Sequence, residues 1–125
     1  MNIILNPEQF VLDRVIFLDS RPNKMIDGHF TKINYSDEIF TMQCLFFELT
    51  PHIAPWLVLF EKRLIAYYLE NKQPTNCRVF EDYKMQNLIQ QTSIFTGSCL
   101  IKISGIWENS AGELGLSFRI IDISI

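Results

Sequence analysis

Cysteine, histidine and long apolar runs are scarce in this 125-residue sequence, and each scarcity excludes a class of protein. Its three cysteines, Cys44, Cys77 and Cys99, lie far apart without a Cys-x-x-Cys pair, which indicates reduced thiols in an intracellular protein that is not secreted. The two histidines, His29 and His52, are not spaced as metal ligands, so no metal is expected. No apolar run approaches the ~20 residues of a membrane-spanning helix, so no membrane partner is expected.

Positive charge is also in short supply. Eleven Lys and Arg residues stand against fourteen Asp and Glu, which gives a net charge of −3. Because proteins that attract nucleic acid by bulk charge are usually basic, any such role must rest on a local patch of cations with stacking rings. The hydrophobic fraction of 48% and the chain length predict one packed domain over residues 1–125.

Catalytic motifs are missing as well. The sequence has no Gly-rich phosphate loop and no Gly-x-Ser-x-Gly elbow. Its paired carboxylates, Asp37-Glu38 and Glu81-Asp82, are adjacent residues of the kind that usually face water. We therefore expect a protein that is not an enzyme and has no cofactor.

Hydrophobic periodicity predicts strands at both ends of the chain and helix between them. The expected strands are residues 15–19, 29–35, 40–49, 99–107 and 115–125, and the expected helices are 56–72 and 81–92. In the first helix, one buried stripe is expected, with Glu61, Lys62 and Arg63 on the opposite side. The expected stripe consists of Trp56, Phe60, Leu64 and Tyr68.

Strict alternation in the 99–107 strand places Trp107 on the same face as Ile101 and Ile103. The last two strands, 99–107 and 115–125, are expected to form a hairpin. The predicted class is α+β, mainly β: a five-stranded antiparallel barrel with a helical insert between strands three and four. This is the element order of the OB-fold, although other α+β folds share it.

Basic and aromatic side chains on the expected strands and the first loop are available to line a binding groove. Phe30 and Lys32 share one face of the 29–35 strand, and Tyr35 lies at the end of that strand, on the other face by alternation. Lys102 and Arg119 lie on the last two strands, and Trp107 ends one of them; Arg21 and Lys24 occupy the first loop. Stacking rings and phosphate-pairing cations are the parts of a single-strand binding surface, while the alternative is an ordinary core and solvent face.

The C-terminal third carries a resemblance to a known family. Residues 98–108 (SCLIKISGIWE) and 115–123 (GLSFRIIDI) resemble the closing hairpin of OB-fold single-stranded-DNA-binding proteins of DNA viruses and phages. Residues 30–36 (FTKINYS), leading into 40–42 (FTM), are similar to hypothetical proteins of large DNA viruses. The resemblance implies an OB-fold and single-stranded DNA binding in viral DNA replication or recombination.

Two functions follow as hypotheses. The first is single-stranded DNA binding by stacking on Phe30, Tyr35 and Trp107, with phosphate contacts from basic side chains on the same sheet. Those basic residues are Lys32, Lys102 and Arg119. The second is a viral structural or protein-interaction module, such as a minor virion component or an inhibitor of a host protein. In either case the apolar segment 116–125 predicts a homo-oligomer, because the sequence has no following element to cover it.

Overall fold

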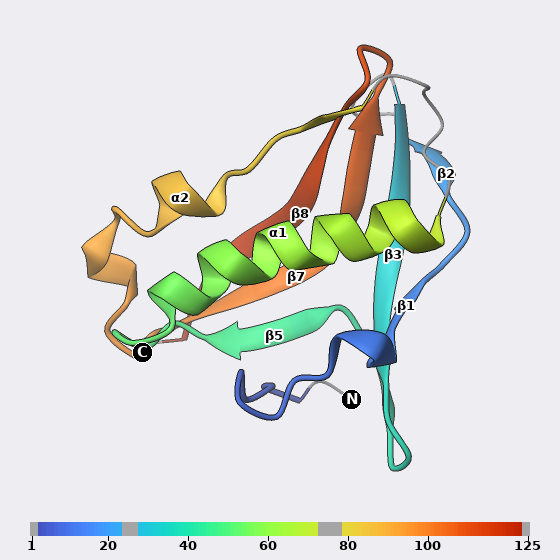
Figure 1. The fold of residues 1–125 in the computed structure, drawn as a ribbon. Helices are drawn as coiled ribbons and strands as arrows, with labels where there is room; N and C mark the ends of the chain where they lie inside the picture. Colours follow the sequence, from blue (N-terminus) through green and yellow to red (C-terminus); the bar gives the residue numbers. More distant parts are fainter. Residues whose placement is uncertain (1–2, 24–27, 73–78, 124–125) are drawn as a thin grey trace.

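The computed structural model describes residues 3–23, 28–72 and 79–123. It is an α+β fold, mainly β, in which one strongly curled, open sheet wraps beneath a long helix (Figure 1). The strands are β1 Val15–Phe17, β2 Arg21–Asn23, β3 Gly28–Ser36, β4 Thr41–Gln43, β5 Leu45–Glu48, β6 Phe80–Glu81, β7 Cys99–Asn109 and β8 Glu113–Asp122. The helices are α1 Ala54–Asn71 and α2 Met85–Leu88, with 3-10 turns at Leu12–Arg14 and Thr92–Ile94. Lys24, Cys77 and the end of the expected 115–125 strand lie outside the described residues.

The sheet has eight strands, so the predicted number of five is wrong. The expected 15–19 strand is the shorter β1, and β2 forms in the stretch expected to be a loop. Both strands pair with β3. The third expected strand is broken at Cys44, whose φ of 67° is left-handed and interrupts an extended strand. Before this break β4 pairs with β3, and after it β5 pairs with β7.

The sheet curls because the two halves of β3 pair with different strands. The first half of β3 pairs with β7, and its second half pairs with β4 and β1. The main path through the sheet is β1-β3-β7-β8-β6, and β7 and β8 form the predicted antiparallel hairpin. The resulting half-barrel is consistent with an OB-like barrel in its curvature and in carrying helix α1 between β5 and β7.

Helix α1 covers one face of the sheet, which we call the inner face. Pro55 occupies its first turn, where a missing backbone N–H costs nothing, so the predicted start is correct to within two residues. Phe60, Leu64 and Tyr68 of the expected stripe are buried, and half-buried Trp56 stacks on Phe60 with ring centroids 4.8 Å apart. The inner face and α1 therefore form the core.

Glu61 departs from its predicted solvent position, because it is 1% exposed. Its two carboxylate oxygens accept the backbone N–H groups of Lys84 (2.8 Å) and Met85 (3.1 Å), which start α2. Desolvation by burial raises the pKa of Glu61 above its ordinary value, while these two hydrogen bonds oppose that rise. The carboxylate thus ties α2 to α1.

The second expected helix is much shorter than residues 81–92. Glu81 belongs to β6, which pairs in parallel with the start of β8, so the helical turn begins only at Met85. Met85 and Leu88 are its buried residues. The strand pairing overrides the local helical pattern that the sequence shows.

A buried polar chain fixes α1 to β3 and β7. The Tyr68 hydroxyl donates to Glu108 Oε2 at 2.7 Å and lies 3.3 Å from the Thr31 hydroxyl. Burial is the main cause that raises the pKa of Tyr68 to about 12, so this hydroxyl keeps its proton. Thr31 and Glu108 both point to the inner face, which leaves their strand neighbours Phe30 and Trp107 on the outer face.

Candidate nucleic-acid interface

Trp107 lies on the outer face of the sheet because β7 contains a bulge. The register against β8 shifts between Ile103 and Gly105, which adds one residue to β7 and reverses the alternation beyond it. Ile106 is therefore fully buried, and Trp107 is half-buried on the side away from α1. The predicted grouping of Trp107 with Ile101 and Ile103 is wrong for this reason.

Two aromatic rings lie over glycines of the neighbouring strands. A Cβ on Gly105 would lie 2.9 Å from the end of the Phe30 ring, and a Cβ on Gly115 would lie 3.1 Å from the Trp107 indole. Each ring thus packs against a glycine of the adjacent strand, where the carbonyl oxygens of Thr31 and Asp82 also leave no room for a Cβ. Phe30 and Trp107 are themselves direct cross-strand partners, so the two rings are neighbours on the outer face.

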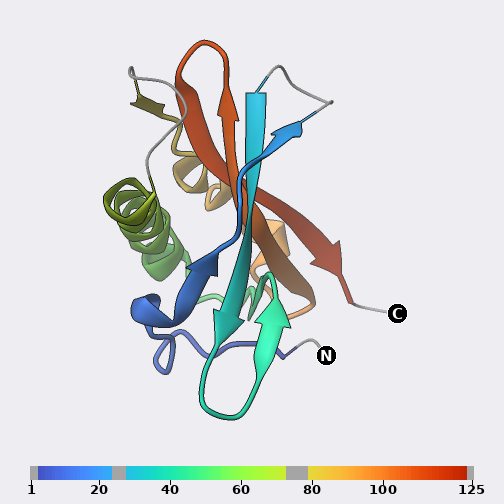
Figure 2. The ribbon, with the colours of Figure 1, turned by 90° about the vertical axis from the view of Figure 1, so that its right-hand side faces the viewer.

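A groove of about 920 Å³ surrounds these rings. It is lined by Phe17, Leu18, Asp19, Arg21, Pro22, Phe30, Lys32, Trp107 and Ser117, and we call it the aromatic–basic groove. Figure 2 shows α1 on one side of the sheet, while β2 and the end of β8 both lean toward the other. Three of the six residues predicted to bind nucleic acid, Phe30, Lys32 and Trp107, are brought together here.

Two further cations belong to this surface. Arg21, expected in a loop, lies on β2 directly opposite Phe30. Lys84 holds its ammonium 5.7 Å from the centre of the Trp107 ring and 3.6 Å from the Asp82 carboxylate. Nothing in the local sequence pairs Lys84 with Trp107, because the contact depends on the chain crossing the edge of β8 after β6. Among the residues lining the groove, Asp19 is the acidic one.

Lys102 and Arg119 lie apart from the groove. They are cross-strand partners on the outer face of β7 and β8, and neither lines the concavity. The Lys102 ammonium lies 6.0 Å from the centre of the Phe46 ring. Five positions separate Lys102 from Trp107, about 15 Å along a strand. The structure therefore places these two cations on the same face as the rings but outside their hollow.

Tyr35 is not available for stacking, and its predicted role is corrected. It is 3% exposed and packs on Phe10, with ring centroids 5.3 Å apart. Its hydroxyl accepts the backbone N–H of Val11 at 3.1 Å. The N-terminal segment covers this ring, so Tyr35 belongs to the core rather than to a binding surface.

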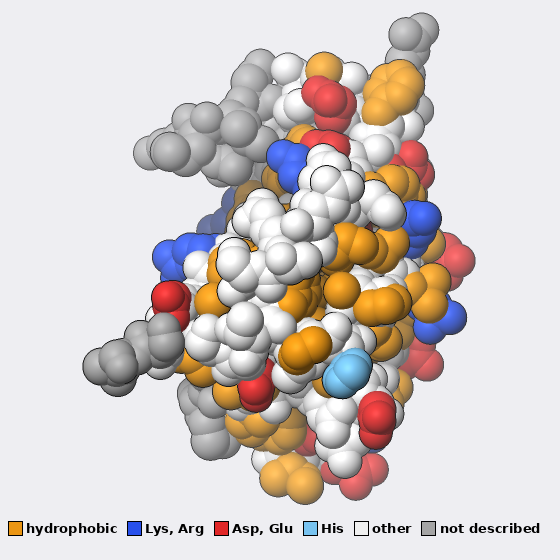
Figure 3. All heavy atoms as spheres, turned by 90° about the vertical axis from the view of Figure 1, so that its left-hand side faces the viewer, with side chains coloured by type: hydrophobic (Ala, Val, Ile, Leu, Met, Phe, Trp, Pro, Cys, Tyr) orange, Lys and Arg blue, Asp and Glu red, His pale blue; other side chains and the backbone are white. Residues whose placement is uncertain are grey.

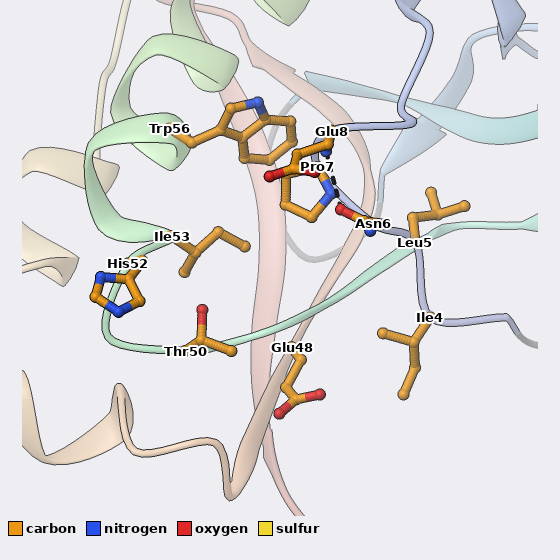
Figure 4. A pocket seen from close by; sticks show the side chains of 10 residues that line it. All are labelled: Ile4, Leu5, Asn6, Pro7, Glu8, Glu48, Thr50, His52, Ile53 and Trp56. Atoms are coloured by element: carbon orange, nitrogen blue, oxygen red, sulfur yellow. Dashed lines mark hydrogen bonds between the residues drawn. The ribbon is translucent and has the colours of Figure 1, made fainter.

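A second cavity, of about 570 Å³, has a different character (Figure 4). It lies between residues 4–8 and the connection from β5 to α1, and its lining includes Trp56, Thr50 and His52. Its charged lining residues are Glu8 and Glu48, with no lysine or arginine. An acidic lining repels phosphate, so this cavity does not compete with the aromatic–basic groove as a nucleic-acid site.

Charge elsewhere on the described surface is mixed. On the face that Figure 3 shows, acidic and basic side chains are scattered among patches of hydrophobic ones, and neither sign forms a continuous field. In the described part of the chain, no three His, Cys, Asp or Glu residues are grouped to hold a metal ion. None of the described helices has the length and apolar character needed to cross a membrane.

Comparison with known proteins yields no relative: no family model, no curated protein and no solved structure matches the chain. The functional assignment therefore depends on the geometry of the groove.

Proposed function

We propose that this protein binds single-stranded nucleic acid, and single-stranded DNA in particular, in the aromatic–basic groove. The observation that carries the proposal is the pairing of Phe30 with Trp107 on the outer face, in a hollow that also contains Arg21 and Lys32. Every base has a flat face that can stack on an aromatic ring, so such a surface binds single strands with little sequence preference. The cations contact phosphates.

The balance of these contributions predicts weak binding for this class of protein. Stacking contributes roughly 1–3 kcal/mol per base. Phosphate contacts by Arg21, Lys32 and Lys84 predict a slope of log K against log salt near −2, at about −0.7 per contact on single strands. With a net charge of −3, the rest of the protein adds no attraction for a polyanion.

The biological setting that we propose is viral DNA replication or recombination. Its support is the resemblance of residues 98–108 and 115–123 to the closing hairpin of viral and phage single-stranded-DNA-binding proteins. The strongly curled half-barrel agrees with the OB-like barrel that this resemblance implies. The intracellular location that we propose follows from the same setting.

Fluorescence anisotropy with a labelled oligothymidylate tests the proposal directly. The intact protein should bind at micromolar concentration in low salt, and binding should weaken along the predicted slope as salt rises. A duplex of the same length should bind more weakly, because its bases are not free to stack on Phe30 and Trp107. Absence of binding to the single strand in low salt would overturn the proposal.

One observation favours a second function, that of a protein-interaction module. Ile39, at the tip of the hairpin between β3 and β4, is 90% exposed, and the hairpin projects from the body of the protein (Figure 1). An apolar side chain presented in this way is suited to insertion into a partner protein. If the oligothymidylate does not bind, a viral structural component or an inhibitor of a host protein becomes the leading assignment.

A further inference from the structure

The rings and cations of the outer face form a row that crosses the strands. Arg21 on β2 is the register partner of Phe30 on β3, and Phe30 is the partner of Trp107 on β7. The row continues to Gly115 on β8, over which the indole lies, and the Lys84 ammonium stands beside that ring. A cation thus stands at each end of a two-ring platform.

Resting on the proposed function, we infer that a bound single strand runs across β2, β3, β7 and β8 along this row. Its site takes two bases, one on Phe30 and one on Trp107, with flanking phosphates at Arg21 and Lys84. The alternative course follows β7 lengthwise from Trp107 to the pair Lys102 and Arg119. The two courses differ by about a right angle and use different cations.

Spacing supports the crossing course. Neighbouring strands lie about 4.8 Å apart, whereas stacked bases in a nucleic-acid strand are about 3.4 Å apart. Two adjacent bases must therefore separate from each other before each can lie on its own ring. Only a flexible single strand does this cheaply, so the platform selects a short unpaired stretch over a duplex. From β2 to β8 the row covers three strand spacings, about 14 Å.

Charge along the row supports the same course. Arg21 and Lys84 are both exposed, and the Lys84 ammonium lies near the Asp82 carboxylate at 3.6 Å, in a surface pair that costs little to open. A phosphate at this point exchanges one oxygen partner for another without moving the backbone. The backbone N–H of Lys84 stays bonded to Glu61, which keeps the side chain at the rim of the groove.

The lengthwise course lacks a stacking surface. Between Trp107 and Lys102, the chain passes through Ile103 and Ile106, which are fully buried, and through the bulge at Ser104 and Gly105. The aromatic ring beside the Lys102 ammonium, that of Phe46, is 7% exposed and offers no face to a base. A strand following β7 would therefore leave the second ring, Phe30, unused.

Oligothymidylates of increasing length, combined with two sets of single variants, distinguish the courses. Affinity should rise steeply up to about three nucleotides, the length that covers the row, and then level off apart from a statistical gain. Arg21→Ala and Lys84→Ala should each lower affinity about tenfold in low salt and reduce the salt slope by about 0.7. Lys102→Ala, the matched control on the same face, should leave both unchanged.

The results distinguish a failure of the crossing course from a failure of the proposed function. If Lys102→Ala and Arg119→Ala weaken binding while Arg21→Ala and Lys84→Ala do not, the crossing course is overturned and the proposed function stands. If the unaltered protein binds no oligothymidylate, the proposed function fails and the inference fails with it. Arg21, Lys84 and Arg119 are exposed and Lys102 is half-buried. Equal melting temperatures would verify that all four variants remain folded.

Discussion

The indole of Trp107 both packs on the sheet and lines the proposed binding groove. It lies against Gly115, where a Cβ would lie 3.1 Å from the ring and 2.8 Å from the Asp82 carbonyl oxygen. Lys84 stands beside the same ring, so one edge of the indole is packed and the rest faces the groove. A half-buried ring of this kind is held in position and still offers a surface to a base.

Removing either ring should weaken oligothymidylate binding without changing its dependence on salt. Trp107→Ala and Phe30→Ala each remove one stacked base, worth roughly 1–3 kcal/mol, so affinity should fall about tenfold to a hundredfold. The salt slope should stay the same because no phosphate contact is lost. Anisotropy titrations at several salt concentrations measure both quantities.

The control for this prediction is Phe80→Ala. Phe80 on β6 is also an exposed aromatic residue, but it does not line the groove, so its loss should leave affinity unchanged. Melting temperatures must accompany the titrations, since Trp107 packs on the sheet. Equal losses for Phe80→Ala and Trp107→Ala would show that stacking in the groove is not the source of binding.

Glu61 predicts a pH dependence of stability. Because its pKa is raised in the folded protein, its contribution to the free energy of unfolding is most favourable below the unfolded value near 4.5. This contribution is lost as pH rises through the folded-state pKa. In Glu61→Gln, the part of the pH dependence due to residue 61 should disappear, although one of the two bonds to α2 is lost as well.

Urea unfolding of both proteins across acidic to neutral pH measures this effect. The difference in stability between the original protein and Glu61→Gln should change with pH in that window, and it should be flat well above it. A difference that is constant through the whole window would show that Glu61 titrates alike in the folded and unfolded states.

Part of the site could be read from the sequence, and part could not. Phe30 and Lys32 follow from simple alternation in a strand without irregularity. Alternation gives the wrong face for Trp107, because one extra residue at Ser104 reverses the alternation beyond it. A glycine inside a strand, here Gly105, is the feature of the sequence that indicates such a bulge. The same alternation puts Tyr35 on the opposite face from Phe30 and Lys32, beside the buried Ile33, and the stacking role assigned to it disregards this signal. Phe10, distant in sequence, completes the cover of its ring.

At the scale of elements, α1 and the aromatic residues beneath it carry the stability of the domain. Phe60 is 3% exposed and its ring lies 5.6 Å from that of Phe47 on β5 and 5.4 Å from that of Phe10, measured between centroids. The helix thus connects the N-terminal segment to the sheet that carries the groove. Loosening this contact should unfold the domain rather than alter binding alone.

Phe60→Ala should lower the free energy of unfolding by roughly 3–5 kcal/mol, the usual cost of emptying a buried aromatic position. The neighbouring Leu59 is 45% exposed, so Leu59→Ala is the matched control and should cost far less. Urea or thermal unfolding followed by circular dichroism gives both values. Equal stabilities for Phe60→Ala and the unaltered protein would contradict the assignment of Phe60 to the core.

Some of the helix and strand boundaries can be predicted from the sequence, and others cannot. Periodicity over many residues predicts α1 and the β7–β8 hairpin, because each has a continuous buried face. Short elements depend on distant partners: β6 exists because it pairs with β8, and it shortens the second helix to Met85–Leu88. The break at Cys44 has no clear signal in its local sequence, since cysteine rarely adopts positive φ.

At the scale of the whole molecule, the outer edge of β8 is the feature that predicts self-association. Leu114 directs its carbonyl toward Asp82, so alternate residues beyond it, Leu116, Phe118 and Ile120, direct their backbone groups to the same edge. Among the described residues, none of these three has a backbone partner on that edge. An unpaired edge with apolar side chains is a template for another strand.

A second copy is the partner that we predict for this edge, in a two-fold antiparallel pairing of β8 with itself. Centring the pair on Arg119 would place two arginines opposite each other, which is unfavourable. Centring on Phe118 or Ile120 avoids this and keeps apolar residues together. The outer faces of the two copies, each with its groove, would then lie on one continuous sheet.

Ile120→Pro is the variant that tests this pairing. Because the Ile120 N–H points away from β7, proline removes a bond to the second copy without breaking one inside the hairpin. Ile120→Thr loses similar apolar surface but keeps the N–H, so it serves as the control. Light scattering should show a dimer for the original protein and for Ile120→Thr, and a monomer for Ile120→Pro with its circular dichroism spectrum retained. A monomeric original protein at high micromolar concentration, or a dimer that survives the proline, would contradict pairing through β8.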